Sequence, residues 1–512
     1  MKKYLPDYFP GIILFFLAVI IGLVVYQDYG ISWDETIQRD LGNVTYNYVF
    51  KGDQALKTYQ DKALGTGFEL PLVILERCLK LKDSRDIYLM RHMVTHIFFL
   101  ISAFCGYVLA LRLFKNQFIA CLGFLLLAFN PRLYAHSFFN SKDIPFLSAF
   151  LISMLICHVA FEKNKYGWYF LLGLACGYAT SIRSMGIIFL PIIGIFFLID
   201  FFKSIQLKEG VNQVIFRTFL FLTGFCSMLC LVWPFLWAAP AKNFIDAFHS
   251  LANIPSGGKV LFNGTWYDNE KLPLAYMPVW FTITIPELWL ASGIAGFLWI
   301  IIAFVKRPLH YLLNAPERNY LLYAACFSGP VIAMIVFHGV NIDDWRHLYF
   351  IYPSFVMMVL FAINRLEQGR GKLIIQSACM LQIGITSYFM IRNHPFQQVY
   401  FNSLVSHEKE YLRNNFELEY WGCSFKQGLE HLVSANKSDS IKIYWSVQPL
   451  FNNILMLREQ DRKRIFVIDD RKGADYIITN FRGNHKVEYP DLKAEYSISV
   501  LNSTIMCIYK LH

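Results

Sequence analysis

Long apolar runs separated by short polar stretches fill the first three quarters of the chain. Each run is close to the roughly 20 residues that an α-helix needs to cross the hydrocarbon core of a bilayer. The pattern predicts about eleven membrane-spanning helices, the first of which starts at Ile12. The others cover residues 93–113, 117–131, 144–161, 168–182, 185–202, 215–238, 284–305, 319–338, 347–363 and 373–391.

The lysines and arginines of the short loops predict the orientation, because cytoplasmic loops are enriched in them. No small-residue cleavage site follows the first run, so we expect a retained helix and not a signal peptide. With the N-terminus inside, every inside loop is basic. The basic residues are Lys2, Lys3, Lys115, Lys163, Lys165, Lys203, Lys208, Lys306, Arg307, Arg365, Arg370 and Lys372. An odd number of spans then places the C-terminus outside, and we expect a multi-pass protein of the plasma (inner) membrane with an outer or periplasmic C-terminal domain.

The pattern changes after residue 391. Apolar runs of strand length occur at 441–447, 465–468, 476–479 and 497–501, with helical stretches at 426–433 and 450–458. Strands that alternate with helices are typical of an α/β domain. We therefore predict a polytopic helical membrane domain over residues 1–391 and a small soluble α/β domain over residues 392–512.

Composition agrees with a membrane protein, since 55% of the residues are hydrophobic and only 16% are charged, against about 25% charged in soluble domains. The net charge is +10, but the chain has no nucleic-acid-binding motif, and its basic loops suit lipid headgroups or phosphate ligands better. P-loop, HExxH and GxSxG motifs are also missing, which leaves ATP-driven transport and serine or zinc hydrolysis without support. Of the 11 cysteines, Cys423 and Cys507 are candidates for a disulfide if their domain faces an oxidising compartment.

The first candidate site is the adjacent carboxylate pair Asp34 and Glu35, just past the first span. One carboxylate could act as general base towards an acceptor hydroxyl, and the other could bind a divalent cation or orient the acceptor. An alternative is that Ser32 and Glu35 form a capping box that begins a helix. The two interpretations are compatible, because a cap can also position a catalytic Asp34.

A second polar cluster separates two predicted spans at residues 130–145. Its cations, Arg132 and Lys142, suit a phosphate together with His136, whereas Asp143 suits a sugar hydroxyl or a metal ion. The alternative is an ordinary helix start with Asp143 as cap.

Further cations lie at the same predicted side of the membrane. Arg183 interrupts two apolar runs, and Arg346 and His347 begin the tenth span. Each suits an anionic ligand, or an arginine at the interface that reaches for lipid headgroups. Trp266 and Tyr267 lie in the aromatic loop at 239–283, where they would stack on sugar rings or belong to the interfacial aromatic belt.

These motifs carry a resemblance to a known family. The segments ISWDE, PRLYAHSFFNSKDIPF, DDWRHLYFIYP, VYFNSLV and ELEYWGCSFKQGLEHL resemble the GT-C glycosyltransferases, and most closely the protein O-mannosyltransferase and aminoarabinose transferase group. The resemblance covers most of the chain but is weak over the last 70 or so residues. It implies a sugar donor carried on a polyprenyl phosphate, a transfer on the outer face, and Asp34 as catalytic base with Glu35 beside it.

Under this resemblance the remaining residues divide into two groups. The donor phosphate is assigned to Arg132, Lys142, Arg183, Arg346 and His347. The sugar and acceptor are assigned to His136, Asn140, Asp143, Trp266 and Tyr267. A divalent cation, Mg or Mn, would bind Glu35 and Asp143. The expected partners are the lipid-linked sugar, membrane lipid and an acceptor that is a glycan, a lipid or a protein, with no nucleic acid.

The chemistry is consistent with this assignment. A polyprenyl phosphate is a good leaving group, so one base and a few cations are enough for an inverting displacement. Two other classes fit the sequence less well. A flippase for a lipid-linked sugar would need the cations but no base, and would favour paired repeats with broken helices, which the sequence lacks. A receptor or assembly factor would use the C-terminal domain as its binding module.

Overall fold

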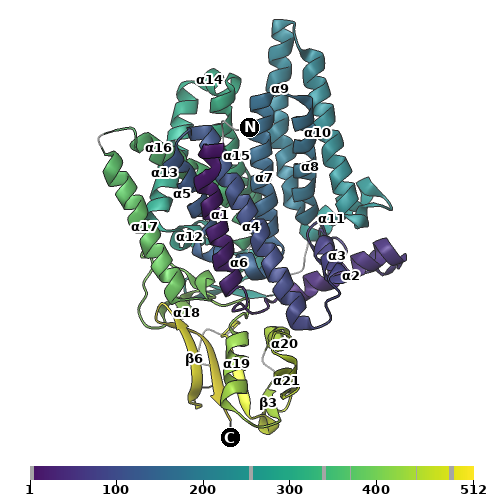
Figure 1. Cartoon of the computed structure of the whole chain (residues 1–512), viewed down its shortest axis with the longest axis vertical. Helices are drawn as coiled ribbons and strands as arrows, with labels where there is room; N and C mark the ends of the chain where they lie inside the picture. Colours follow the sequence, from purple (N-terminus) through teal and green to yellow (C-terminus); the bar gives the residue numbers. More distant parts are fainter. Residues whose placement is uncertain are drawn as a thin grey trace.

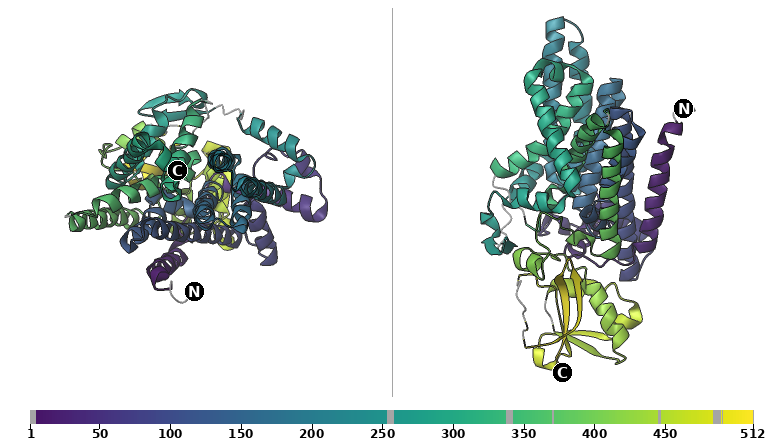
Figure 2. Two further views of the ribbon diagram at one scale, coloured as in Figure 1. Left: turned by 90° about the horizontal axis from the view of Figure 1, so that it is seen from above. Right: turned by 90° about the vertical axis from the view of Figure 1, so that its left-hand side faces the viewer.

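The computed structural model describes residues 5–252, 258–336, 342–369, 371–444, 447–483, 489 and 491–511. A tall bundle of helices carries a small domain with a sheet at one end, and the two further views show the same division (Figures 1 and 2). We call the end of the bundle that meets this domain the domain side. The C-terminus lies at the far tip of the domain (Figure 1).

The bundle consists of helices that match the predicted spans. They are α1 (Leu5–Val25), α4 (Ser84–Phe114), α5 (Gln117–Ala128), α7 (Asp143–Lys163), α8 (Tyr166–Ile182), α9 (Phe189–Leu207), α10 (Val211–Val232), α13 (Glu287–Lys306), α15 (Ala315–Val336), α16 (Tyr352–Leu366) and α17 (Lys372–Arg392). The shorter helices α6 (Pro131–Phe139), α11 (Pro240–Ala252), α12 (Tyr276–Thr284) and α14 (Pro308–Leu313) connect them. Two 3-10 segments, η2 (Ser184–Ile188) and η5 (Arg346–Ile351), lead into α9 and α16.

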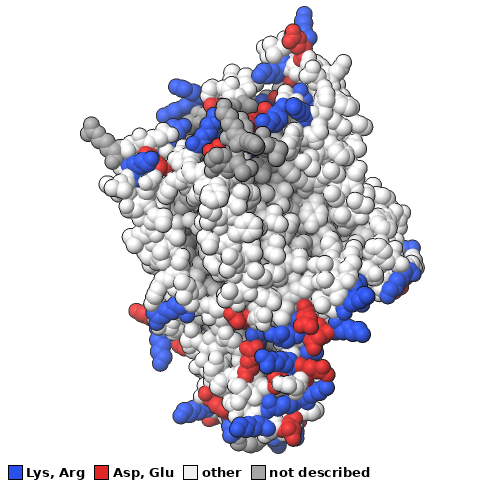
Figure 3. All heavy atoms as spheres, viewed as in Figure 1, with Lys and Arg blue, Asp and Glu red and all other residues white. Residues whose placement is uncertain are grey.

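Fewer of these helices meet the length of a full span than the sequence predicts. Among the described residues, 9 helices are long and apolar enough to cross a membrane, or up to 10 when α5 and α6 count as one span bent by 55°. The remaining predicted span is α8, which has 17 residues and runs along α7 and α10 (Figure 1). The charged side chains lie towards the two ends of the molecule, and a broad uncharged belt separates them (Figure 3). The predicted polytopic helical membrane fold is thereby confirmed.

The long first loop is more ordered than the sequence suggests. It forms α2 (Glu35–Lys51) and α3 (Glu69–Cys78), which lie beside the domain end of the bundle (Figure 1). The helix α4 begins at Ser84, nine residues before the predicted span at residue 93, because Asp83 caps it by accepting from the Arg85 amide at 2.8 Å. The first turns of α4 are predicted as loop because they carry the charged residues Arg85, Asp86 and Arg91, yet Arg91 is buried together with His92.

The C-terminal region has the predicted α/β composition. All four predicted strands form, as β3 (Ile441–Tyr444), β4 (Ile465–Ile468), β5 (Tyr476–Thr479) and β6 (Ala494–Val500), and a fifth strand, β7 (Ser503–Lys510), completes a sheet in the order β4-β3-β5-β7-β6. Residues 445 and 446 of the first predicted strand lie outside the described residues. Strands β3, β4 and β5 are parallel, whereas β7 runs antiparallel to β5 and β6. The helices of this region are α18 (Tyr411–Asn415), α19 (Phe425–Ala435), α20 (Gln448–Ile454) and α21 (Glu459–Arg462).

Two features of this region differ from expectation. Cys423 and Cys507 are both buried free thiols, so the candidate disulfide between them is not formed. They belong to separate hydrophobic clusters, which explains why they do not meet. In addition, the aromatic loop at 239–283 contains a two-stranded hairpin, β1 (Lys259–Phe262) and β2 (Thr265–Asp268), that the sequence did not reveal.

Candidate active site

Three carboxylates from distant segments converge on one arginine at the domain side of the bundle. Arg346 opens η5, shortly after Asp343, whose backbone is left-handed with φ of 58°. The Arg346 guanidinium lies 3.2 Å from the Asp34 carboxylate and 3.5 Å from that of Asp143. It also contacts the Asp343 carboxylate at 3.0 Å. Predicted site residues from the first loop, the start of α7 and the start of η5 are therefore in direct contact.

Asp143 joins a second arginine to this group. Its Oδ1 lies 2.9 Å from Arg183 Nη2, and the carboxylate is only 3% exposed. Asn140 fixes the carboxylate by donating to Oδ2 at 3.0 Å, and in return accepts from the Asp143 amide at 2.8 Å. We call Asp34, Asp143, Arg183, Asp343 and Arg346 the arginine–carboxylate cluster.

The adjacent acids Asp34 and Glu35 have different environments. Asp34 precedes the first residue of α2 but makes no side-chain capping bond, and its carboxylate is 33% exposed. Glu35 is 2% exposed; it accepts from the Ser32 amide at 2.8 Å and lies 3.1 Å from His92 Nε2. Glu35 thus makes the capping contact that the sequence offered as an alternative. Its carboxylate is directed to α4 and away from the cluster, so its predicted role beside Asp34 finds no support in this geometry.

The first loop also holds Arg183 in place. Gly67 donates from its amide to the Ser181 carbonyl at 3.1 Å, two residues before Arg183. A Cβ on Gly65 would come within 2.2 Å of the same carbonyl oxygen, so only glycine allows this approach. The loop that carries Asp34 is therefore packed directly against the segment that carries Arg183.

Lys142 adds positive charge at the edge of the cluster, and the His347 imidazole adds a hydrogen-bonding group beside it. Both are partly exposed, and both lie within electrostatic reach of Asp143 and Arg183. Burial, reinforced by the charge of Arg183, lowers the pKa of Lys142 to about 8. Together with Arg183, whose side chain is 14% exposed, Lys142 is a cation that an anionic ligand could reach, and His347 offers a hydrogen-bond donor at the same edge.

Arg132 forms a separate and fully buried pair. It lies 2.8 Å from the Asp344 carboxylate, with side-chain exposures of 2% and 0%. Asp344 also accepts from the hydroxyls of Tyr349 at 2.9 Å and Tyr420 at 2.7 Å. Arg132 also donates from Nε and Nη2 to the Tyr400 carbonyl. The prediction that Arg132 binds the donor phosphate is not supported, because its donors are occupied and shielded from solvent.

His136 and Asn140, predicted to contact sugar or acceptor, are buried behind the cluster as well. The Trp421 indole donates to His136 Nε2 at 3.3 Å, and Asn140 lies 3.1 Å from His136 Nδ1. The Trp421 ring in turn lies under the Arg346 guanidinium, 4.7 Å from its carbon to the ring centre. This geometry indicates that the two residues position Asp143 and Arg346, and that a substrate does not reach them directly.

The C-terminal domain forms hydrogen bonds with the segment that leads into Asp34. Asn453 accepts from the Ile31 amide at 2.9 Å and donates to the Ile31 carbonyl at 3.0 Å. Its neighbour Asn452 donates to the carbonyl of Ser32 at 3.0 Å. Since Asn452 and Asn453 are buried in α20, the domain holds residues 31–33 much as a neighbouring strand would. We call this contact the asparagine clamp.

The domain also contributes an arginine that the sequence analysis missed. Arg482, in the loop after β5, binds the Asp343 carboxylate at 3.1 Å, and its guanidinium carbon lies 4.9 Å from the centre of the Trp33 ring. Burial raises the pKa of Asp343, but the neighbouring charges of Arg482 and Arg346 outweigh it and lower that pKa overall. No local motif marks Arg482, because its role depends on how the domain docks.

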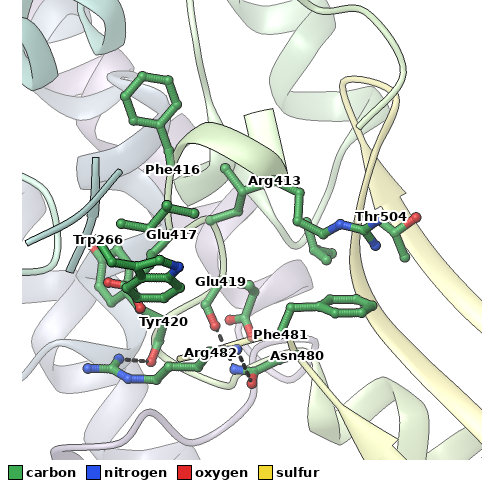
Figure 4. Close-up of a pocket in the computed structure, with 13 residues that line it drawn as sticks. Trp266, Arg413, Phe416, Glu417, Glu419, Tyr420, Asn480, Phe481, Arg482 and Thr504 are labelled. Carbon is green, nitrogen blue, oxygen red and sulfur yellow. Dashed lines mark hydrogen bonds between the residues drawn. The ribbon is translucent and has the colours of Figure 1, made fainter. Parts of the chain in front are cut away.

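A small pocket lies between the β1–β2 hairpin and this domain (Figure 4). Trp266, predicted to contact a sugar, lines it. Tyr267 does not line it, since successive residues of a strand point to opposite faces, and its ring instead packs near Phe262. Trp266 and Tyr267, both predicted to contact a sugar, therefore point to opposite faces of the hairpin.

The residues predicted to bind a divalent cation do not form a common site. Among the described residues, no group of three or more His, Cys, Asp or Glu side chains is placed to hold a metal ion. The predicted ligands Glu35 and Asp143 face His92 and two arginines, respectively. Arginine groups therefore occupy the positions around Asp143 that a divalent cation would need.

Comparison with known proteins supports the fold. Residues 85–237, from the first turn of α4 to just beyond α10, match the family model for dolichyl-phosphate-mannose-protein mannosyltransferase. The oligosaccharyltransferase of Archaeoglobus fulgidus in the apo form is similar over 94% of this chain and 70% of that chain, with 11% identity and a TM-score of 0.50. ArnT from Cupriavidus metallidurans in the apo state is similar over 96% and 97%, also with 11% identity and a TM-score of 0.50. No curated protein sequence matches the chain.

Proposed function

We propose that this chain, which has the membrane fold of the GT-C glycosyltransferases as its sequence predicted, transfers a sugar from a polyprenyl phosphate to an acceptor hydroxyl. The observation that carries the proposal is the contact between Asp34 and Arg346 in the arginine–carboxylate cluster. It places a partly exposed carboxylate within electrostatic reach of two partly exposed cations, Arg183 and Lys142. The family model matched by residues 85–237 is named for an enzyme of this donor class.

Asp34 is the proposed general base. Its carboxylate is the most exposed acid of the cluster at 33%, against 3% for Asp143 and 6% for Asp343. It would accept the proton of the acceptor hydroxyl while the oxygen forms a bond to the anomeric carbon. The bond from that carbon to the phosphate oxygen breaks, and the electron pair leaves on the phosphate. A single displacement of this kind inverts the anomeric centre.

Arg183, Lys142 and His347 would receive the leaving phosphate. Arg183 offers a planar fork of N–H donors that matches phosphate geometry, and Lys142 and His347 add donors at the same edge. Cations placed where negative charge develops stabilise the transition state, because they need no reorganisation during the reaction. No general acid is needed, since the phosphate leaves as a stable anion.

Arg346 has the role that a divalent cation would have in such a site. It holds Asp34, Asp143 and Asp343 together, so their negative charges do not repel the donor phosphate. In this proposal the reaction does not need the Mg or Mn ion expected from the sequence. Removal of divalent cations with a chelator tests this.

The basic loops predict the side of the membrane on which the reaction takes place. Lys115, Lys163 and Lys306 lie at the opposite ends of their helices from the domain side, as positive-inside orientation requires. The cluster and the C-terminal domain would accordingly face the outer or periplasmic side of the plasma membrane. A polyprenyl carrier reaches this level because its phosphate stays at the bilayer surface while its chain remains in the lipid.

The proposal is tested by replacing Asp34 with Asn in the full-length protein. Consumption of a radiolabelled polyprenyl-phosphate sugar by purified protein in detergent, without any ion gradient, should fall by about 100- to 10,000-fold, the usual contribution of a general base. Asp40→Asn is the matched control, because Asp40 lies exposed on α2, the helix that begins directly after Asp34. Wild-type turnover by Asp34→Asn would remove this residue from the mechanism. A wild-type protein that consumes no donor but moves it between leaflets of a vesicle would be a flippase.

A further inference from the structure

Arg482 is a charged residue of the C-terminal domain to which the proposed transfer gives no role. The loop that carries it is fixed by Asn480, which donates to the Glu419 carbonyl at 2.8 Å and accepts from the Arg482 amide at 3.3 Å. Arg482 donates from Nη1 to the Tyr420 carbonyl (Figure 4). With this nitrogen bonded inside its own domain, the guanidinium directs its other terminal nitrogen, Nη2, to the membrane domain.

The Arg482 guanidinium begins a line of alternating charges that ends at Asp34. Its Nη2 lies 3.1 Å from Asp343 Oδ1, and Asp343 Oδ2 lies 3.0 Å from Arg346 Nη2. The other terminal nitrogen of Arg346, Nη1, lies 3.2 Å from the Asp34 carboxylate. Asp343 therefore binds one arginine with each of its oxygens. Without Arg482, Arg346 would have to balance the charge of Asp343 while it also holds Asp34.

Arg482 also contacts the residue that precedes Asp34. Its guanidinium carbon lies 4.9 Å from the centre of the Trp33 ring. The Trp33 amide donates to the Trp421 carbonyl at 3.0 Å, so the C-terminal domain holds this residue both by its backbone and by its ring. Because α2 begins directly after Asp34, the direction of the Asp34 side chain depends on how Trp33 is held.

Cations from separate segments act on Asp34. They are Arg346 in direct contact, and Lys142, Arg183 and Arg482 within electrostatic reach. Arg482 is the member of this set that the C-terminal domain supplies. Glu417 also lies within electrostatic reach of Arg482. Burial raises the pKa of Glu417 to about 7, so at neutral pH this carboxyl takes up part of the arginine charge and leaves the rest to Asp343.

We propose that Arg482 is a positioning residue for Asp34, through which the docked C-terminal domain fixes the place and the electrostatic environment of the proposed base. The proposal rests on the transfer reaction proposed above. The arginine–carboxylate cluster by itself has two arginines and three carboxylates, and Arg482 supplies the third positive charge. The charge of Lys142 then remains available to the donor phosphate.

The C-terminal domain contains a matched control for the effect of docking alone. Arg462 of α21 also bridges to the bundle, with Nη2 2.9 Å from Asp83 Oδ1, and its side chain is 24% exposed, against 25% for Arg482. The partners of Arg462 are Asp83, Ser84 and the Leu457 carbonyl, which lie outside the cluster. Loss of either arginine removes a bridge between the domain and the bundle, but loss of Arg482 also removes a charge from the cluster.

The first measurement compares Arg482→Gln and Arg462→Gln in the full-length protein in detergent. The kcat for the polyprenyl-phosphate sugar should fall by about 10- to 100-fold in Arg482→Gln, because small displacements of a catalytic group have effects of this size. Arg462→Gln should stay within about twofold of wild type, since partly exposed ion pairs contribute little. The KM for the donor should change by less than about threefold in both variants, because neither arginine is proposed to bind the phosphate. Arg482→Lys should recover part of the lost kcat, because it keeps the charge.

The second measurement does not depend on turnover. A carbodiimide couples glycine ethyl ester to carboxyl groups in their protonated form, and mass spectrometry of the peptide that contains Asp34 gives the extent of labelling at each pH. With less positive charge nearby, the protonated form of Asp34 persists to higher pH. The midpoint of labelling should therefore rise by about half a pH unit in Arg482→Gln and stay at the wild-type value in Arg462→Gln.

Either of two results would overturn the proposal and leave Arg482 as a docking contact. These are an unshifted labelling midpoint in Arg482→Gln, and equal losses of kcat in Arg482→Gln and Arg462→Gln. If Arg482→Gln does not fold, Arg482→Met takes its place with the same expectations, because it removes the charge and keeps a long side chain.

Failure of this proposal and failure of the transfer reaction give different results. If Asp34→Asn is inactive while Arg482→Gln behaves like Arg462→Gln, the transfer reaction stands and the role of Arg482 is lost. If the wild-type protein consumes no donor, the transfer reaction is lost, and the labelling midpoints still decide whether Arg482 acts on Asp34.

Discussion

The arginine–carboxylate cluster and the Arg132–Asp344 pair use the same chemical groups in opposite ways. Asp343 and Asp344 are neighbours in the chain, yet one joins Arg346 beside the partly exposed Asp34 and the other joins Arg132 in the interior. The Arg132 and Asp344 side chains are 2% and 0% exposed, whereas Asp34 in the cluster is 33% exposed. Buried pairs of this kind hold elements together, and an accessible carboxylate can exchange protons with a ligand. Exposure, more than residue type, separates structural from chemical roles here.

Replacing one acid from each region gives the largest expected contrast. Asp344→Asn leaves Arg132 buried without its counter-charge, which typically costs about 3–5 kcal/mol of folding free energy. Asp34→Asn should leave the unfolding temperature near that of wild type, while activity falls as stated above. Thermal unfolding of the purified variants in detergent measures both effects. Equal stability of the two variants would show that the regions do not differ as described.

Arg183→Ala should mainly weaken donor binding. Loss of a charged hydrogen bond costs about 1.5–3 kcal/mol, so the KM for the polyprenyl-phosphate sugar should rise by about 10- to 100-fold. Arg183→Lys should recover part of this loss because it keeps the charge. Arg217→Ala serves as control, because Arg217 is a partly exposed arginine of α10 whose guanidinium bonds Gln213 of the same helix. An unchanged KM together with a reduced kcat would assign Arg183 to the support of Asp143 instead.

The pH dependence of donor binding should reveal Lys142. Its pKa is lowered to about 8, so the ammonium is present below that pH and is lost as the pH rises through it. The KM for the donor should rise by about tenfold between pH 7 and pH 9, following the charged fraction. Lys142→Arg should flatten this rise, since arginine stays charged throughout. The same rise in the Arg variant would exclude Lys142 as its source.

Chelation should have the smallest effect. Because Arg346 already neutralises Asp34 and Asp143, EDTA is expected to change the rate by less than about twofold, whereas a metal-dependent enzyme would lose most of its activity. A strong loss that Mg or Mn reverses would show that a cation displaces Arg346 during the reaction. That result would restore the cation predicted from the sequence.

The sequence predicts the membrane helices well because a helix that crosses lipid requires a long run of apolar residues. Each long apolar run became a helix, while the charged first turns of α4 were missed because their partners come from α2 and α3. The convergence of Asp34, Asp143, Arg183 and Arg346 was predictable, since all of them lie at span ends on one side. Their supporting contacts were not, because accessibility depends on tertiary packing. This is why Arg132, which looked like a phosphate ligand, is a buried structural residue.

Arg482 illustrates the other limit of sequence reasoning. It lies in the C-terminal domain, 139 residues beyond the Asp343 that it binds, and nothing in its immediate sequence marks it. The strand β7 was missed for a different reason. The sequence predicts one strand at residues 497–501, and the residues that follow it, which form β7, were not assigned to a second strand. Long-range docking and strand pairing are set by partners that local patterns do not specify.

The asparagine clamp has a consequence for how the protein comes into being. Asn453 and Ile31 are separated by 422 positions, so the ribosome synthesises Asn453 long after the segment that contains Ile31 has been inserted at the bilayer. Until α20 has emerged and docked, the loop with Asp34 lacks its support. A prematurely terminated product would be inserted and yet inert. Catalysis thus requires that the polypeptide be completed and that its C-terminal domain dock.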